Sequence, residues 1–381
     1  MNILVTDSNY KHSLGIVRQL GKDGYTPYIL SYKKNSLCSY SKYSNKEIVI
    51  QQEFNMNDLL NLLKPYKIEL IILVGTDSFK KIVPWKKELK NNNINIITVD
   101  NNILNIAFSK KDTYLLAQEI GVPIAKTFYP QSLDELDILQ NIITFPCVIK
   151  GLFEVGGNIV DYAYSKEELK DKYIQICDKY NLKNSDELPM LQEYITGVGC
   201  AFFAVYNNGN CGLTFQHKRV REYPVSGGAS VCAESYKNDL VEKYGKKLLD
   251  RLKWHGVAMV EFKLNDNNIP ILMEINPKFW GSTDLALESG VNFSKALIEI
   301  YKENSIQYSN IYKYPLKYHW LLDGEILHLI SNPKAIFSII LDTLNPKVKG
   351  NLWISDPLPI YFRIRGLIKG IFKRIKRFFY V

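Results

Sequence analysis

The first hundred residues alternate short apolar segments with amphipathic ones, and this pattern constrains the fold more than any other feature. Apolar segments of strand length occur at 3–6, 26–30, 47–50, 70–74 and 96–99. Segments with helical periodicity lie between them, at 14–20, 56–63 and 79–89. The alternation predicts an open, largely parallel α/β sheet. Its first turn, residues 7–9, lacks a G-x-G-x-x-G pattern, so a dinucleotide-binding site is not favoured.

A second region of α+β type follows a helix predicted at 109–121, which Ser109 would cap and Gly121 would end. Its strands are predicted at 146–150, 190–195, 201–206, 213–220, 257–264 and 269–275, and its helices at 166–179, 239–252 and 285–301. Turn sequences at 207–209 and 266–268 predict two antiparallel hairpins. A chain of 381 residues is long enough for two or three domains.

One of these hairpins carries acidic side chains within otherwise apolar strands. Glu274 and Asn276 are two residues apart, so their side chains share one face of a strand. Counting inward from the turn at 266–268, Glu261 of the partner strand could come opposite Glu274. Like charges on paired strands repel, and Mg²⁺, which prefers oxygen ligands, would relieve that repulsion. The alternative is that these acids face solvent.

Three other segments carry polar residues at strand ends or edges. Lys150 ends an apolar strand, where an anionic partner would compensate its burial, and Gly156 and Gly157 follow in a loop whose backbone could approach a phosphate. The strand at 190–195 could present backbone groups to an adenine ring. Taken alone, each segment has an ordinary explanation that is at least as good. Lys150 could simply extend to solvent from the strand end, and residues 190–195 could be an ordinary amphipathic strand.

The third segment contains Arg219 and Arg221, which are two residues apart and are predicted to share a strand face. Guanidinium groups suit carboxylates and phosphates because they offer paired donors. The alternative is a solvated basic edge strand.

Taken in order, these residues resemble the ATP-grasp superfamily, in particular its carbamoyl-phosphate-synthase-like and biotin-carboxylase-like branch of carboxylate–amine and carboxylate–thiol ligases. The resemblance covers residues 1 to about 300 and is strongest at 109–112, 145–151, 191–197 and 273–282. It implies a Rossmann-like domain at 1–108 and a two-part ATP-grasp domain with antiparallel sheets at 109–302, whose lid lies at about 125–195. A C-terminal extension at 303–360 and a basic amphipathic helix at 361–381 would follow.

The resemblance also implies roles for individual residues. The ATP-binding residues would be Lys110 and Lys150 on the phosphates, Gly156 and Gly157 in the covering loop, and Glu193, Tyr194 and Ile195 beside adenine. The metal, Mg²⁺ or alternatively Mn²⁺, would be bound by Glu261, Glu274 and Asn276. Catalytic contacts with the carboxylate or its acyl phosphate would come from Arg219, Arg221 and Lys278.

The function implied is an ATP-dependent ligase that activates a carboxylate as an acyl phosphate and transfers it to an amine or a similar nucleophile. Two positions depart from the family pattern. Many members have an acid, which contacts the ribose, where this chain has Gly199, and arginine where it has Lys278. The alternative is a nucleotide-binding or scaffold protein without turnover, recruited to a membrane surface.

Positive charge is concentrated at the C-terminus. The net charge is +9, but residues 361–381 contain seven basic residues and no acids, and the rest of the chain has 41 basic and 39 acidic residues. A nearly neutral body does not favour nucleic-acid binding. Apolar residues at helical spacing in the tail favour an interfacial helix on anionic lipid, with packing on the body or a subunit contact as alternatives.

The cysteines and histidines indicate no further chemistry. None of the six cysteines forms a C-x-x-C pair, and the five histidines lack metal-ligand spacing. Neither a signal-peptide pattern nor a run of about 18 apolar residues is present. We therefore expect a cytoplasmic enzyme, with its tail on the inner face of the membrane, acting on small-molecule carboxylate and amine substrates. A homodimer is left open.

Overall fold

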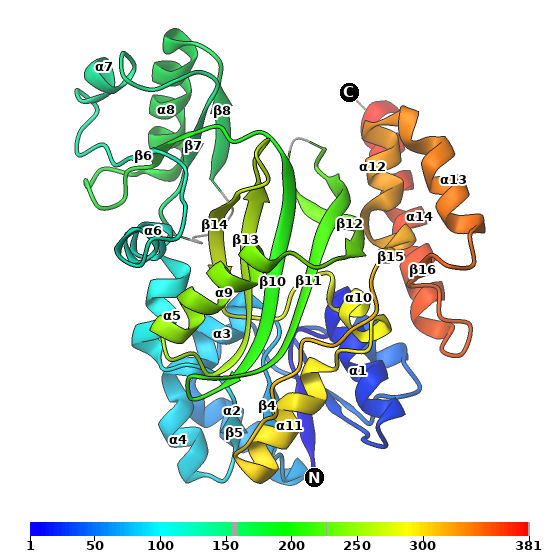
Figure 1. The fold of residues 1–381 in the computed structure, drawn as a ribbon. Coiled ribbons are helices and arrows are strands. Elements are labelled where there is room, and N and C mark those ends of the chain that lie inside the picture. The colour runs from blue at the N-terminus through cyan, green and yellow to red at the C-terminus, as the bar shows by residue number, and fades with distance from the viewer. Residues whose placement is uncertain (154–158, 226, 380–381) are drawn as a thin grey trace.

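Three β-sheets and their helices make up the protein (Figure 1). The computed structural model describes the backbone of residues 1–153, 159–225 and 227–379, with side chains described as far as residue 369. One sheet is parallel, one is antiparallel, and the third is antiparallel except at one edge. This mixture of α/β and α+β architecture confirms the predicted fold class.

The N-terminal sheet has five parallel strands in the order β3-β2-β1-β4-β5. The strands are β1 (Ile3–Val5), β2 (Tyr28–Ser31), β3 (Glu47–Val49), β4 (Leu70–Ile72) and β5 (Asn95–Ile96). The helices are α1 (Lys11–Lys22), α2 (Met56–Leu63), α3 (Thr76–Ile82), α4 (Lys86–Asn91) and α5 (Asn101–Phe108). The predicted open parallel sheet is confirmed. The helix predicted at 79–89 is divided, because Pro84 lacks a backbone N–H and lies in a 3₁₀ turn between α3 and α4.

The second sheet lies at the far end of the molecule from the N-terminus (Figure 1). Its four antiparallel strands are β6 (Thr127–Phe128), β9 (Met190–Glu193), β7 (Cys147–Lys150) and β8 (Val160–Ala163), in that order. The helices α7 (Leu136–Leu139) and α8 (Lys166–Tyr180) accompany it. Ile149, Leu169 and Tyr173 belong to a core of buried residues that this unit has to itself. We refer to this unit as the lid.

The third and largest sheet has seven strands in the order β14-β13-β10-β11-β12-β15-β16. They are β10 (Val198–Asn207), β11 (Asn210–Tyr223), β12 (Ala229–Ser235), β13 (Gly256–Leu264), β14 (Pro270–Asn276), β15 (Leu316–His319) and β16 (Lys349–Gly350). Both predicted hairpins, β10–β11 and β13–β14, are confirmed. The strands β12, β15 and β16 were not predicted, and the last two carry the sheet past residue 302. One hydrophobic core joins Leu4 and Ile71 of the first sheet to Phe202 and Phe262 of this one.

Four helices pack around the large sheet: α6 (Lys110–Glu119), α9 (Asp239–Arg251), α10 (Thr283–Glu288) and α11 (Phe293–Glu303). The prediction of one helix at 285–301 is wrong. Between α10 and α11 the chain passes through Gly290, whose φ of +97° interrupts helical geometry.

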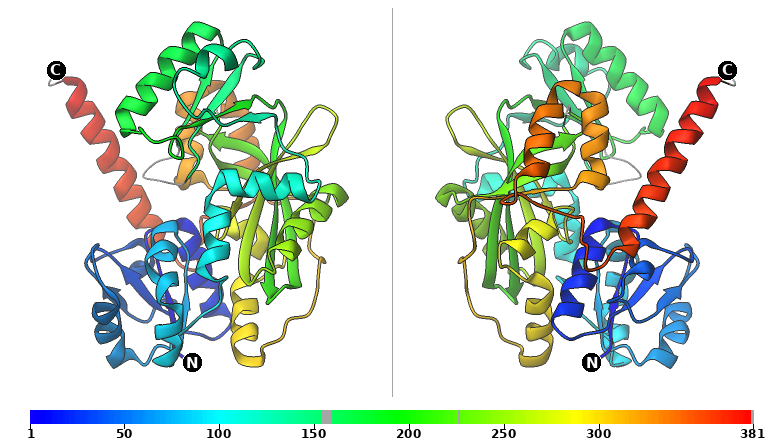
Figure 2. Two further views of the ribbon diagram at one scale, coloured as in Figure 1. Left: turned by 90° about the vertical axis from the view of Figure 1, so that its left-hand side faces the viewer. Right: turned by 90° about the vertical axis from the view of Figure 1, so that its right-hand side faces the viewer.

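The C-terminal residues form α12 (Ile326–Ser331), α13 (Ile336–Leu344) and α14 (Leu358–Phe379) on one side of the large sheet (Figure 1). The helix predicted at 361–381 is confirmed as far as Phe379 and begins three residues earlier, at Leu358. It extends away from the rest of the chain (Figure 2). Within the described ranges, no helix is both long enough and apolar enough to cross a bilayer.

Candidate active site

The two central carboxylates meet across the β13–β14 hairpin. Glu261 lies directly opposite Glu274, as predicted. Regular pairing from Leu264 and Pro270 at the turn would instead place Met273 opposite Glu261, but a bulge adds one residue to β14 at this point. The carbonyl of Met273 accepts a hydrogen bond of 2.7 Å from the Tyr114 hydroxyl of α6. The bulge therefore aligns the two acids and gives α6 a fixed attachment to β14.

The environments of these two acids differ. Burial raises the pKa of Glu261, and the charge of Glu274 adds to that effect against the lowering influence of Arg219. For Glu274, burial is outweighed by Lys110, Lys150 and the Asn276 amide, so its pKa lies below the usual range. Asn276 donates a hydrogen bond of 2.7 Å to Glu274, which confirms that the two side chains share a face. The site therefore holds one firmly ionised carboxylate beside one whose charge is destabilised.

Lys110 and Lys150 come from different elements and meet beside Glu274. Ser109 caps α6 as predicted, accepting a hydrogen bond from the Asp112 backbone. The Lys110 backbone N–H donates to the carbonyl of Leu152, just after β7, which holds the start of α6 against the lid. The Lys110 ammonium lies 3.6 Å from a Glu274 oxygen. Both lysines are thus next to the carboxylate pair.

Tyr114 fixes the second lysine and was not identified from the sequence. The Lys150 ammonium donates a hydrogen bond of 3.1 Å to the Tyr114 hydroxyl, which in turn donates to β14. Burial lowers the pKa of Lys150, but Tyr114 and Glu274 more than compensate, so its pKa is raised and it remains charged. A buried tyrosine one turn after Lys110 has no sequence signal, because its partners lie on two distant strands.

The side chain of Arg219 on β11 reaches across the neighbouring strand β10 to Glu261 on β13. Its guanidinium lies 2.5 Å from Glu261 and 3.3 Å from Glu222. The neighbouring strand has Gly199 at this point, and a Cβ there would lie 2.8 Å from the Arg219 Cδ atom. The absence of a side chain at residue 199, which departs from the family pattern, therefore gives Arg219 the space it occupies.

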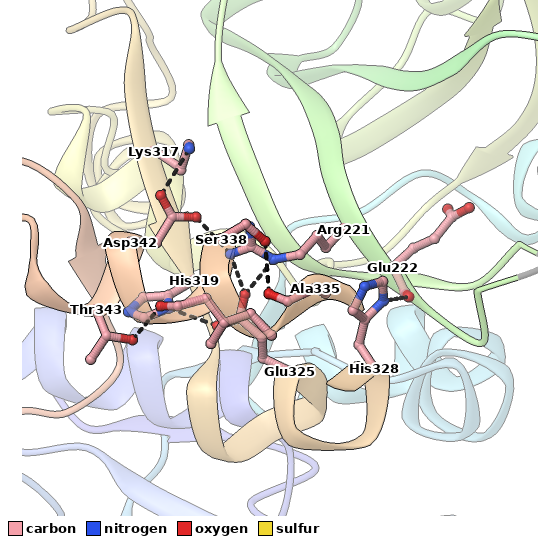
Figure 3. A network of polar contacts seen from close by, with 11 residues as sticks. Arg221, Glu222, Lys317, His319, Glu325, His328, Ala335, Ser338, Asp342 and Thr343 are labelled. Atoms are coloured by element: carbon pink, nitrogen blue, oxygen red, sulfur yellow. Dashed lines mark hydrogen bonds and ion pairs between the residues drawn. The ribbon is translucent and has the colours of Figure 1, made fainter. Parts of the chain in front are cut away.

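Arg221 does not share this face, and the prediction that it does is wrong. A bulge places Val220 as an extra residue between Arg219 and Arg221, so the alternation of side chains is reversed. Arg221 instead points towards the C-terminal helices and forms ion pairs with Glu325 and Asp342 (Figure 3). Its charge is neutralised inside the protein, away from the cavity described next.

A cavity of about 490 Å³ lies above the carboxylates. Six of the predicted site residues line it: Lys150, Arg219, Glu261, Glu274, Asn276 and Lys278. Lys110 lies behind Glu274 rather than in the lining. The predicted adenine contacts Glu193, Tyr194 and Ile195 are not among the described residues that line the cavity. Tyr194 does pack on the lining residue Tyr162, with ring centres 5.7 Å apart. Gly156 and Gly157 lie outside the described residues.

The opposite wall of the cavity comes from the N-terminal sheet and was not predicted. Tyr10 and His12 follow β1, and Gly75 and Thr76 follow β4. The strand order reverses between β1 and β4, which is where open α/β sheets hold ligands at the carboxyl ends of their strands. Lys278 reaches across and donates a hydrogen bond to the Thr76 hydroxyl. Knowledge of the strand order would have predicted that these residues line the cavity, but the strand order cannot be derived from the residue types.

Two histidines in this cavity are neutral. Burial, followed by nearby positive charge, lowers the pKa of both His12 and His217 to about 3. His217 Nε2 forms a hydrogen bond of 2.7 Å with Ser282, while its buried Nδ1 atom has no partner among the described residues. The buried Nε1 atom of Trp280, also in the lining, has none either. Buried polar atoms are normally satisfied, so these two atoms, like the buried Nδ1 of His12, depart from the usual pattern beside the cavity.

A family model described as "ATP-grasp in the biosynthetic pathway with Ter operon" matches residues 189–323. This range includes the strands that carry Arg219, Glu261 and Glu274. The chain contains an ATP-grasp domain. Among the residues that the structure describes, no group of three or more His, Cys, Asp or Glu side chains is placed to hold a metal ion.

The ATP-grasp domain and the residues around it are similar to carbamoyl phosphate synthase large chains. That of Saccharolobus islandicus (strain L.S.2.15 / Lassen #1) is 23% identical over 281 residues, which cover 70% of this chain and 25% of the relative. That of Methanosarcina mazei is 22% identical over 275 residues, covering 69% and 25%. The chain thus spans about a quarter of the length of the curated relatives it matches.

Solved structures share the fold of the ATP-grasp domain and its neighbours. A biotin carboxylase–beta-gamma-ATP complex from Campylobacter jejuni has a TM-score of 0.69 at 14% identity, over 83% of this chain and 74% of that one. N5-carboxyaminoimidazole synthetase from Staphylococcus aureus has a TM-score of 0.64 at 14% identity, over 82% and 79%. The biotin carboxylase domain of 2-oxoglutarate carboxylase from Hydrogenobacter thermophilus, in complex with MgADP and bicarbonate, gives 0.68 at 14%, over 83% and 73%.

Proposed function

We propose that this protein is an ATP- and Mg²⁺-dependent ligase, which activates a carboxylate as an acyl phosphate and transfers it to an amine or a similar nucleophile. The observation that carries the proposal is the alignment of Glu261 with Glu274 beside Lys110 and Lys150, within an ATP-grasp domain. Relatives and fold neighbours named as carbamoyl phosphate synthase, biotin carboxylase and N5-carboxyaminoimidazole synthetase support it.

The donor set of the hairpin fits Mg²⁺. Two carboxylates and an amide provide hard oxygen atoms on one face, which leaves room for phosphate oxygens and water in the coordination shell. Mn²⁺ accepts the same donors and is the second candidate. The metal, when bound by Glu261, Glu274 and Asn276, would neutralise charge on the phosphates. In the structure, Lys110 and Arg219 partly offset the charge of the two acids instead.

Lys110 and Lys150 are proposed to contact the phosphates of ATP. Both ammonium groups are held by the protein itself, Lys110 at the capped start of α6 and Lys150 through Tyr114. A preorganised positive charge stabilises a transferring phosphoryl group without rearrangement during the reaction. Glu193, Tyr194 and Ile195, at the end of β9, remain the proposed adenine contacts, and the loop with Gly156 and Gly157 the proposed cover.

Arg219 and Lys278 are proposed to bind the carboxylate substrate. Both line the cavity between the carboxylate pair and the N-terminal wall, so an anion held there would lie next to the phosphates. One carboxylate oxygen would attack the γ-phosphorus and ADP would leave; the acceptor would then attack the acyl carbon and displace inorganic phosphate. Tyr10, His12, Thr76 and neutral His217 offer the acceptor hydrogen-bonding groups without charge.

Nucleotide binding by the Glu274→Ala variant tests the metal and ATP assignment. We expect Mg²⁺-dependent affinity for a non-hydrolysable ATP analogue, measured by calorimetry, to fall by at least about 100-fold. The variant removes a proposed metal ligand, and loss of a residue that merely hydrogen-bonds to a metal ligand already lowers metal affinity by about 10- to 100-fold. Glu234→Ala is the matched control, since Glu234 also lies on the large sheet and pairs with a lysine, Lys218, at 3.0 Å. Unchanged affinity in Glu274→Ala would refute the metal site.

A second candidate is a nucleotide-binding or scaffold protein without turnover, which the absence of an acid at Gly199 motivates. Hydroxylamine converts acyl phosphates to hydroxamates, so the intact protein with MgATP and a panel of carboxylates separates the two. A hydroxamate that forms with one carboxylate, and not with Glu274→Ala, is the result expected of a ligase. Tight nucleotide binding with no hydroxamate and no ADP formation from any carboxylate would favour the second candidate.

A further inference from the structure

Helix α13 exposes an apolar stripe. Ile339 and Asp342 face inward and are almost fully buried, whereas Phe337, Leu341 and Leu344 are 76%, 68% and 74% exposed. These three residues are spaced by four and three positions, so they follow one side of the helix. Ile340, beside them, is 45% exposed. Contiguous exposed apolar side chains of this size mark an interaction surface.

The segment that contains α13 is rich in basic residues and poor in acidic ones. From residue 326 to the end, the sequence has ten lysines and arginines and two acids, Asp342 and Asp356. Asp342 is paired with Arg221 and with Lys317, and Asp356 is paired with Arg18 at 2.8 Å. Both acids are buried. Among the described side chains of this segment, which end at residue 369, every charge exposed to solvent is therefore basic.

Helix α14 contains seven of these ten basic residues. Its first turns are anchored, because Phe362 packs on Tyr40 with ring centres 4.8 Å apart and Arg363 pairs with Asp323 at 2.9 Å. Beyond them, Ile364 and Ile368 are 42% and 48% exposed. The helix continues outward on the side of the molecule that also carries α13 (Figures 1 and 2). In the described part of α14, the exposed basic residues Arg365 and Lys369 thus lie next in sequence to exposed apolar ones.

The chemistry of this surface selects its partner. A two-fold contact with a second copy would bring two α14 helices of like charge together, which is unfavourable. An anionic bilayer offers headgroups for the basic residues and acyl chains for the apolar stripe. We propose that α13 and α14 form one docking surface for an anionic lipid bilayer, with α13 as an apolar contact that the tail alone does not supply. The proposal does not depend on the ligase chemistry.

Co-sedimentation of the full chain with lipid vesicles tests this surface. We expect the protein to pellet with vesicles of phosphatidylglycerol and phosphatidylcholine, and at least tenfold less with phosphatidylcholine alone or at high salt. The double variant Phe337→Glu with Leu341→Glu should bind the anionic vesicles at least tenfold more weakly. The matched control is Ile138→Glu, because Ile138 on the lid helix α7 is similarly exposed, at 63%, and should bind as the unaltered chain does.

The basic contribution is measured separately with Arg365→Gln, Lys369→Gln, Lys373→Gln and Lys376→Gln combined in the full chain. We expect at least a tenfold loss and a weaker salt dependence. Thermal melting of each variant confirms that its fold is retained. Equal pelleting of the α13 double variant and the unaltered chain would overturn the proposal. So would a vesicle-free dimer that the double variant abolishes, since α13 would then be a contact between copies.

Discussion

At the scale of single residues, Met273 determines which side chains meet in the site. The sequence predicted that Glu261 and Glu274 face each other, but regular pairing from Leu264 and Pro270 would place Met273 opposite Glu261, so the outcome required the bulge. The bulge at Met273 was not predicted, and the Met273 carbonyl has its hydrogen-bond donor in Tyr114, 159 residues away. The prediction that Arg221 shares a face with Arg219 was wrong because side chains alternate only where a strand is regular, and the extra residue Val220 interrupts the strand.

Asp284 gives a prediction at this scale. It is buried between α1 and the large sheet, accepts a hydrogen bond of 2.9 Å from Trp320, and has its pKa raised by burial to about 6. Because the folded state then holds the proton more tightly than the unfolded state, this group's stabilisation is complete below about pH 4 and is lost as pH rises through 6. Relative to Asp284→Asn, the protein should lose about 3 kcal/mol of stability across that interval.

Urea unfolding of both proteins at several pH values between 4 and 7 measures the difference. Only the change in the difference with pH matters, so any packing effect of asparagine cancels. Two parallel pH profiles would show that Asp284 has no raised pKa in the folded protein. A difference that grows with pH in favour of the unaltered chain would contradict the sign.

At the scale of elements, those with strong local signals were predicted and those defined by tertiary contacts were not. The helices α2 and α6 and the hairpin β13–β14 have caps or turn sequences that fix their ends. The short strand β15 pairs with the edge of β12, and β16 pairs in turn with β15. The break between α10 and α11 passes through Gly290, yet apolar periodicity continues across it.

The N-cap of α6 gives a prediction at this scale. Ser109→Ala removes the acceptor for the Asp112 backbone N–H and should destabilise the helix by about 1 kcal/mol, with Ser109→Gly less harmful. Since Lys110 is the first residue of this helix, affinity for an ATP analogue should fall about fivefold. Ser165→Ala removes the same kind of cap from α8 and should leave the affinity unchanged within about twofold. An equal loss in both variants would show that α6 has no special role.

At the scale of the whole molecule, the cavity belongs to no single sheet. The lid supplies Lys150, the large sheet supplies the carboxylates, and the loops after β1 and β4 supply the third wall. The order of these parts along the chain was predicted from the sequence. Their mutual orientation was not, because it results from a core shared between the first and third sheets.

The attachment of the C-terminal helices gives a prediction at this scale. Arg221→Ala would leave Glu325 and Asp342 buried with less compensating charge, although His319 and Lys317 still contact them (Figure 3). The protein should lose about 3 to 5 kcal/mol of stability in urea unfolding. Arg251→Ala is the control, because Arg251 pairs with Glu119 in solvent and should contribute less than about 1 kcal/mol. Equal effects would mean that the buried network does not hold these helices in place.

The extra residue at Val220 also affects how relatives of this chain should be compared. Residues 219 and 221 have the same chemical type, yet one contacts the carboxylate pair and the other holds the C-terminal helices. A homologue with two arginines in the same spacing but a regular strand at this point would place both on one face. An alignment scored by residue type would then match second arginines that do different work, so the pairing of this segment with β12 is as informative as its composition.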